Sequence, residues 1–170
     1  MCNRGTTPTM PDAPTQPHPA AAPRVIVTLS DAQCREVLAR QRMCVVSVVD
    51  GDEPYAVPVF YGFDGGDLYL GVAEGRKTRA LDRNARVYIL VTEVGPGDAW
   101  RSVAVAGEVR SLRDPEERQR GVDVLIAHNR RVRALTSEAP VTPRPRSGGR
   151  ILRVERAVVT GRSFGDPTAG

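Results

Sequence analysis

The side chains best suited to chemistry are three consecutive residues near the middle of the chain, Arg76, Lys77 and Thr78. They lie in the first turn of a predicted short helix, where cations oppose the helix dipole. An anion among them would reverse this effect. Free backbone N–H groups, the Thr78 hydroxyl and the cations would converge on it, as they do at phosphate sites. The alternative is an exposed helix whose charges pair with Asp82 or Glu74.

Lys77 differs from the other basic residues because it is the only lysine among the 24 cationic side chains. An ammonium group binds an anion as a compact point charge, whereas arginine binds with a planar fork. A phosphate contact would explain a lysine at this position, and chance retention is the alternative.

A second candidate is the strand that contains Val57, Pro58, Val59 and Phe60. Proline within a strand removes a ladder donor, so such strands lie at a sheet edge or beside a ligand. A flat apolar ligand along this strand would use the backbone groups of Val57 and Val59. An ordinary edge strand is the alternative.

A third candidate is the sequence Trp100-Arg101-Ser102 at the start of a later strand. The lone tryptophan would cover an apolar edge, while Arg101 and Ser102 would hydrogen-bond to a polar rim. A core tryptophan beside an exposed arginine is the alternative.

Six strands and three helices are predicted to position these residues. The first helix begins at Ser30, which forms a capping box with Gln33 behind the staple residue Leu29. The second runs from Glu74-Gly75 through Leu81, and the third follows the Asp114 cap and Pro115. The predicted strands cover 43–49, 55–61, 68–72, 87–93, 102–112 and 151–160.

The pattern of these strands predicts the fold class. Strand 43–49 is a nearly continuous apolar run, which predicts burial on both sides. Short strands at close spacing, joined by tight turns, favour an antiparallel barrel with helices packed outside it.

The composition agrees with one mainly β domain. Hydrophobic residues make up 41% of the 170 residues but aromatic residues only 5%, so small aliphatic side chains must fill the core. The net charge is +4, but the arginines are scattered among 20 acidic residues. A nucleic-acid site needs a basic stripe with stacking aromatics, so we expect no nucleic-acid partner.

The domain is expected to cover 24–164. Residues 1–23, with six prolines, are predicted to form a disordered tail, 165–170 a C-terminal tail, and 136–149 a surface loop. Cys34 and Cys44 are interpreted as small buried hydrophobes, and no metal site is expected. The sequence shows no membrane span and no signal-peptide pattern, so we expect a cytoplasmic protein.

The order of three segments resembles a known superfamily. They are PYAVPVFYGFDGGDLYLGVAEGRKTRALDRNARVYILV, WRSVAVAGEVRSL and ILRVERAVVTGR. Together they resemble the FMN-binding split-barrel superfamily of pyridoxamine 5'-phosphate oxidases, closest to its Nim-like branch related to nitroimidazole-resistance proteins. The resemblance covers about residues 29–163. It implies a mainly β fold, a six-stranded antiparallel split β-barrel of Greek-key type with peripheral helices.

The resemblance also implies a homodimer with FMN across its interface. The flavin rings and ribityl chain would be lined by Tyr55, Val57, Pro58, Val59 and Phe60. The phosphate would be held by Arg76, Lys77 and Thr78, while the partner subunit would supply Trp100, Arg101 and Ser102. The implied reaction is oxidation or reduction of a small organic substrate, with NAD(P)H as electron donor and catalytic residues unidentified.

One departure from the branch concerns Gly71, since Nim-like proteins commonly have histidine there. Its absence argues against nitroimidazole reduction by the usual route. A haem role is disfavoured as well, because only His128 is placed to serve as an axial ligand. The alternatives left open are the deazaflavin coenzyme in the same barrel, a non-catalytic flavin-binding or sensing module and, more remotely, a structural or DNA-associated protein.

Overall fold

The computed structural model of the chain describes residues 25–136 and 149–165. The predicted tail 1–23, residues 166–170 of the predicted tail 165–170 and most of the predicted loop 136–149 lie outside these residues. Within the described ranges, no helix is both long and apolar enough to cross a membrane.

The predicted six strands and three helices are all present, with one further strand. In chain order the elements are β1 Ile26–Thr28, α1 Asp31–Arg40, β2 Met43–Asp50, β3 Glu53–Phe63, β4 Leu68–Val72, α2 Arg76–Arg83, β5 Arg86–Val94, β6 Trp100–Ser111, α3 Pro115–Leu135 and β7 Arg150–Phe164. The unpredicted strand is β1, which pairs with the end of β7. At three residues it is too short to show an alternating pattern.

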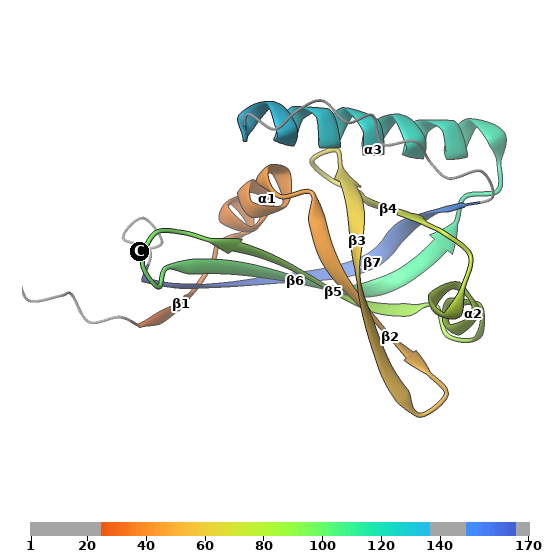
Figure 1. The fold of residues 1–170 in the computed structure, drawn as a ribbon, viewed down its shortest axis with the longest axis horizontal. Helices are drawn as coiled ribbons and strands as arrows, with labels where there is room; N and C mark the ends of the chain where they lie inside the picture. The colour runs from red at the N-terminus through yellow and green to blue at the C-terminus, as the bar shows by residue number, and fades with distance from the viewer. Residues whose placement is uncertain (1–24, 137–148, 166–170) are drawn as a thin grey trace, which may run out of the picture.

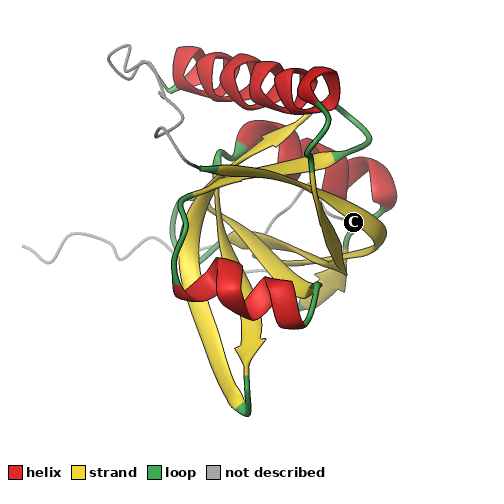
Figure 2. Ribbon diagram, turned by 90° about the vertical axis from the view of Figure 1, so that its right-hand side faces the viewer, coloured by secondary structure: helices red, strands yellow, loops and turns green. Residues whose placement is uncertain are grey.

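The strands form a closed, twisted sheet. Their order is β1-β7-β4-β3-β2-β5-β6, and a further pairing of β6 with β7 closes the six longer strands into a barrel. The helices lie outside it, with α3 along one side (Figure 1) and α2 at a separate position on the barrel wall (Figure 2). The expected split barrel with peripheral helices is therefore confirmed.

Small aliphatic residues fill the barrel, as the composition predicted. Ile89 and Val103 are fully buried, together with Tyr61, whose hydroxyl donates to the Leu38 carbonyl oxygen at 2.8 Å. The Ser30–Gln33 capping box begins α1 as predicted. Cys44 is buried, and burial raises the pKa of its thiol to about 12, so it behaves as a core side chain.

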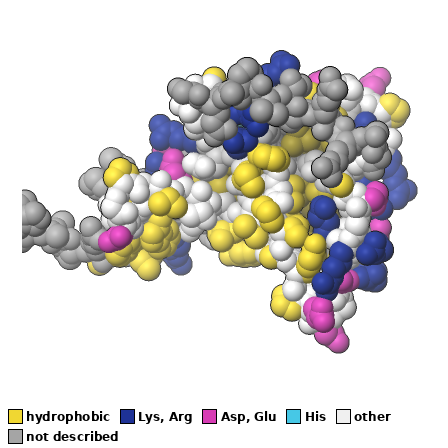
Figure 3. All heavy atoms as spheres, viewed as in Figure 1, with side chains coloured by type: hydrophobic (Ala, Val, Ile, Leu, Met, Phe, Trp, Pro, Cys, Tyr) yellow, Lys and Arg dark blue, Asp and Glu magenta, His cyan; other side chains and the backbone are white. Residues whose placement is uncertain are grey.

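Within a single subunit, strand 43–49 is not buried on both sides as predicted. Burial alternates along β2, and Met43, Val45 and Val49 are exposed on its outer face. Val45 lies opposite Leu90 of β5, which is also exposed. The continuous apolar run thus contains one set of side chains in the core and a second set on an apolar outer surface. Figure 3 shows this surface over the centre of the molecule.

Candidate functional site

The candidate site begins where β3 and β4 separate. Their ladder ends at the pair Tyr61–Leu70. Beyond this pair β3 continues beside β2, whereas Gly71 and Val72 at the end of β4 pair with β7. Among the described strands, the edge of β3 that faces away from β2 therefore lies open along residues 54–60.

The two prolines of β3 occupy this edge. The Tyr61 N–H donates to the Arg42 carbonyl oxygen at 3.1 Å, so Tyr61 directs its backbone groups to the β2 side. Because this direction alternates along an antiparallel strand, Pro54 and Pro58 face the open edge. The absence of an N–H group at these two prolines therefore removes no hydrogen bond between β3 and β2.

The same alternation corrects one expectation about this strand. Val57 and Val59 direct their backbone groups to β2 and do not offer them to a ligand. Ala56 and Phe60 direct theirs into the opening instead. The side chains of Val57 and Val59 nevertheless line the cavity described next.

Helix α3 converts this opening into a groove. It lies across β3 and β4, where the missing side chain of Gly62 lets it approach: an added Cβ would lie 2.8 Å from Leu125 Cα. A second glycine, Gly121, makes the same kind of close contact, because its Cβ would lie 2.8 Å from Ile151 Cγ2. The apolar side of α3 thereby becomes one wall of the cavity.

The groove has a volume of about 680 Å³. Its lining consists of Val57, Pro58, Val59, Phe60, Gly71, Val72, Ala73, Lys77, Val122, Leu125, Ile126, Asn129, Arg133, Gly149, Arg150 and Ile151. The walls are mainly aliphatic, and all charged residues of this lining are cations. An apolar pocket with a few positive groups suits a flat ligand that carries an anionic group.

Lys77 is a cation of this groove that is available to a ligand. The ammonium group makes no hydrogen bond or ion pair with the residues that the structure describes. Arg150, by contrast, is bound by Glu74 at 2.5 Å and by Asp82 at 2.5 Å. The bond to Arg150 is the main reason why the pKa of Glu74 and that of Asp82 lie below their usual values. These carboxylates are thus already neutralised at the groove rim.

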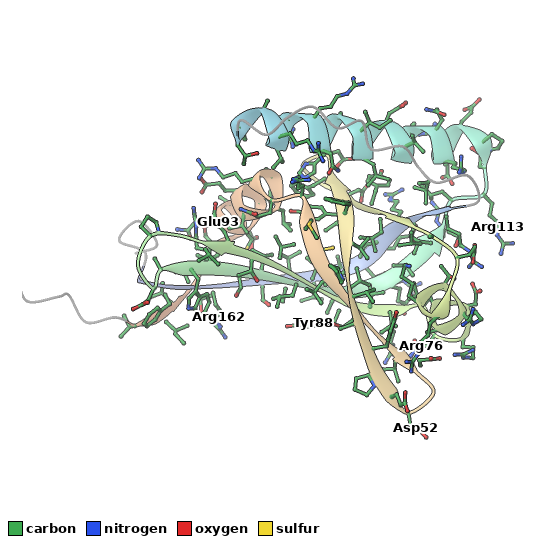
Figure 4. All side chains as sticks on the ribbon, viewed as in Figure 1. Asp52, Arg76, Tyr88, Glu93, Arg113 and Arg162 are labelled. Atoms are coloured by element: carbon green, nitrogen blue, oxygen red, sulfur yellow. The ribbon has the colours of Figure 1, made fainter. Side chains whose placement is uncertain are left out.

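Arg76 is placed differently from Lys77, although the two are neighbours. Its guanidinium binds Asp50 at 2.6 Å and Glu53 at 2.6 Å and lies 4.7 Å from the centre of the Tyr55 ring. Figure 4 shows it beside the β2–β3 hairpin, whose tip carries Asp52. The expected alternative partners, Asp82 and Glu74, are not the ones it uses. Arg76 and Tyr55 therefore lie next to the groove without lining it.

Thr78 has a structural role at the start of α2. Its hydroxyl accepts from the Gly75 N–H at 2.9 Å and lies 3.0 Å from Glu74 Oε2, to which it donates. The side chain is buried, so the hydroxyl is committed to fixing this helix end. Of the three predicted phosphate ligands, only Lys77 lines the groove.

The sequence Trp100-Arg101-Ser102 lies on an arm of the sheet remote from α2 (Figure 1). Trp100 stacks on Phe164, with 6.2 Å between the ring centres. Arg101 binds Glu93 at 2.8 Å, and Figure 4 shows Glu93 near α1. None of the three lines the groove of its own subunit, so any contact with a ligand there would have to come from another copy of the chain.

Gly71, at the position where the resemblance to Nim-like proteins implies a histidine, lines the groove. A Cβ at this position would lie 3.4 Å from Leu125 Cδ1, so the neighbouring side chain need shift only slightly. The glycine therefore leaves open space that a larger side chain would occupy.

The contribution of α3 was missed by sequence reasoning. Asn129 and Arg133 line the groove from this helix, beside Leu125 and Ile126. A signal was present, since Asn129 is four residues from Leu125 and Arg133 on a face that is otherwise apolar. This signal did not connect Asn129 and Arg133 with the site, because both residues are far from Lys77 in the sequence.

A second cavity, of about 880 Å³, lies between α1, the β3–β4 turn and β7. Its charged lining residues are Asp31, Arg35, Asp67, Arg153, Glu155 and Arg156. Arg153 is bound by Asp67 at 2.8 Å. Positive and negative groups are present in equal number, so this cavity does not favour an anion as the groove does.

Comparison with known proteins shows similarity over nearly the whole described chain. Residues 30–163 match the family described as pyridoxamine 5'-phosphate oxidase. An uncharacterised protein of Rhizobium meliloti (strain 1021) is 29% identical over 84 residues, which are 49% of this chain and 56% of that protein. The match thus spans little more than half the length of that relative.

Solved structures have the same fold. A FAD-binding protein from Mesorhizobium loti is 25% identical, with a TM-score of 0.66 over 82% of this chain and 98% of that chain. A candidate 5-nitroimidazole resistance protein from Bacteroides thetaiotaomicron is 22% identical, with a TM-score of 0.63 over 84% of this chain and 90% of that one.

Proposed function

Because the chain belongs to the pyridoxamine 5'-phosphate oxidase family, we propose that it is a flavoprotein that binds FMN in the groove between β3, β4 and α3. Lys77 is the observation that carries the proposal. It is a cation with no ion pair among the described residues, and it lies in an aliphatic cavity where Arg150 and the neighbouring Arg76 are already bound by carboxylates. A phosphate at this position would supply the missing counter-charge.

The residues of the groove fit the parts of a flavin. The aliphatic side chains of β3 and α3 would cover the ring system, and Gly71 would leave room for it. Lys77 would hold the phosphate, while Arg76 and Thr78 keep α2 in place through their own contacts. A bound flavin supplies the electron-transfer chemistry, and the protein supplies position and electrostatics. We propose a small organic substrate and NAD(P)H as electron donor.

A cytoplasmic homodimer is part of this proposal. The outer face of β2, β3 and β5 exposes Met43, Val45, Phe60, Tyr88 and Leu90. Such a continuous apolar surface marks an interaction site. A second copy would cover it and bring its Trp100–Ser102 arm toward the groove.

A non-catalytic flavin-binding module is the second candidate. It is favoured by one observation: the described lining of the groove contains no Asp, Glu, His or Cys side chain that could transfer protons. Bound flavin that NAD(P)H does not reduce, and that turns over no small organic substrate, would support the module over the oxidoreductase.

The identity of the cofactor can be tested on the purified protein. We expect a yellow protein whose denaturation releases FMN, identified by its mass and visible spectrum. Release of FAD or of the deazaflavin coenzyme would correct the cofactor and retain the site. A colourless protein that gains no visible absorbance with either flavin or with the deazaflavin would reject the proposal.

The role of Lys77 is tested by Lys77→Gln, with Arg79→Gln as the matched control on the exposed face of the same helix. Loss of a charge-assisted contact costs about 1.5–3 kcal/mol, so FMN affinity should fall by roughly 10- to 150-fold. Riboflavin, which has no phosphate, should bind both proteins equally. Equal FMN affinity in K77Q and wild type would remove Lys77 from the site.

A further inference from the structure

The end of the groove remote from Lys77 carries a polar pair that the proposed phosphate site does not use. Along α3 the groove extends from Val122 to Arg133. At 1.5 Å per residue this is about 16 Å. The Val122 end lies near Lys77 and Arg150, because neighbouring Gly121 contacts Ile151, the residue after Arg150. The other end holds Asn129 and Arg133.

Asn129 is held in a fixed orientation. Its side chain is 2% exposed, and its Nδ2 donates to the Tyr61 carbonyl at 2.9 Å and to the Leu125 carbonyl at 2.9 Å. Two carbonyl acceptors identify the nitrogen and use both of its protons. Its Oδ1 makes no hydrogen bond to the residues that the structure describes. This oxygen can only accept a hydrogen bond.

Arg133 lies one helical turn beyond Asn129. Side chains four residues apart lie next to each other on a helix face, and both residues line the groove. The pair therefore presents a fixed acceptor beside a cationic donor.

We propose that Asn129 and Arg133 bind the pyrimidine edge of the flavin ring system. That edge carries an imide, in which an N–H lies beside a C=O. The N–H would donate to Asn129 Oδ1, and the C=O would accept from Arg133. This inference rests on the proposed function and adds the orientation of the ring: phosphate at Lys77, pyrimidine end at Asn129 and Arg133.

The orientation has an electrostatic consequence. Reduction of a flavin places negative charge on its pyrimidine edge, and a nearby cation stabilises that charge. Arg133 would therefore bind the reduced ring more strongly than the oxidised one and raise the midpoint potential.

The hydrogen bond to Asn129 is tested with wild-type protein and two ligands, FMN and 3-methyl-FMN, which lacks the imide proton. We expect 3-methyl-FMN to bind at least tenfold more weakly. In Asn129→Ala, which removes the acceptor and makes room for the methyl group, this difference should shrink to less than threefold. Equal binding of both ligands by the wild type, or an undiminished difference in a folded N129A, would overturn the proposal for Asn129.

Arg133 is tested through the midpoint potential of bound FMN in Arg133→Gln, with Arg130→Gln as the exposed control on the same helix. A tenfold loss of preference for the reduced ring lowers a two-electron potential by about 30 mV. We expect this shift in R133Q and none in R130Q. Equal potentials in both would overturn the assignment, and would do so even if N129A failed to fold. A wild type that binds no flavin rejects the proposed function itself, a result distinct from either outcome.

Discussion

Gly62 of β3 and Leu125 of α3 pack backbone to backbone. An added Cβ on Gly62 would lie 2.8 Å from Leu125 Cα and 2.9 Å from its nitrogen. Neither atom belongs to a flexible side-chain end, so only a shift of the whole helix relieves the clash. The position of the α3 wall of the groove therefore depends on the absence of a side chain at Gly62.

The first prediction is that Gly62→Ala destabilises the protein and disturbs the groove. Forcing an extra carbon into a packed contact costs roughly 1–3 kcal/mol. The unfolding midpoint in urea should fall, and FMN affinity with it. Gly66→Ala is the control, because its nearest neighbour would be 3.8 Å away, and it should leave both measurements nearly unchanged. A fully stable G62A with normal affinity would contradict this account of the helix position.

His128 connects α3 to the segment between α1 and β2. Its Nε2 lies 2.7 Å from the Gln41 carbonyl oxygen, its Nδ1 lies 3.1 Å from the Arg131 guanidinium, and its ring packs on Tyr61. A carbonyl requires a proton on Nε2, and a guanidinium requires a lone pair on Nδ1, so the ring is neutral. Burial, reinforced by Arg131, lowers its pKa below the usual 6.5.

The second prediction concerns pH. Since the native His128 has the lower pKa, the unfolded chain binds more protons once the pH falls below about 6.5. The free energy of unfolding should be fully retained above that pH and decline below it, by no more than about 1.4 kcal/mol per unit. Urea unfolding of the wild type between pH 7.5 and 5.5 measures this. In His128→Asn this decline in the free energy of unfolding should disappear. If the decline persists, another titrating group causes it. The carboxylates with lowered pKa values, such as Asp50, act only at lower pH.

Much of the fold followed from local signals. The capping box at Ser30, the Asp114 cap with Pro115 and the turn glycines fixed helix starts and hairpins, because these motifs satisfy backbone groups within a few residues. The short strand β1 gave no such signal, since only its pairing with β7 defines it. Apolar strand 43–49 was misassigned for a related reason: whether an outward valine is covered depends on neighbours that the strand itself does not contain.

The site was predictable in part. Lys77 could be selected from the sequence because it is the only lysine and follows a helix start. Its neighbour Arg76 could not be separated from it, since the carboxylates that bind Arg76 lie on a hairpin more than twenty residues earlier. Asn129 and Arg133 join the groove only through the packing of α3. No local sequence pattern predicts such long-range contacts.

A third prediction concerns Arg150, which neutralises Glu74 and Asp82 at the rim of the groove. Arg150→Gln leaves both carboxylates uncompensated near the phosphate position, so FMN affinity should fall and should recover partly at high salt, which screens them. Isothermal titration at two salt concentrations provides the measurement. Arg156→Gln, an ion-paired arginine farther along the same strand, is the control and should bind FMN normally. A salt-independent loss in R150Q would indicate a direct contact with the ligand instead.

The fourth prediction tests the apolar face that we propose to join two subunits. Tyr88 is 51% exposed on this face, opposite Ser47 of β2 and Ala106 of β6, and it points outward in Figure 4. Tyr88→Glu would place a charge where a second copy must exclude water. A buried unsatisfied polar group costs on the order of 1–3 kcal/mol, and a charge costs more, so the dimer dissociation constant should rise at least tenfold. Light scattering across micromolar concentrations measures this dissociation constant.

Leu135→Glu, the same kind of change at an exposed apolar residue at the end of α3, should leave the dimer intact. If the wild type is monomeric at these concentrations, or if Y88E and L135E associate equally, the two subunits do not meet through this face.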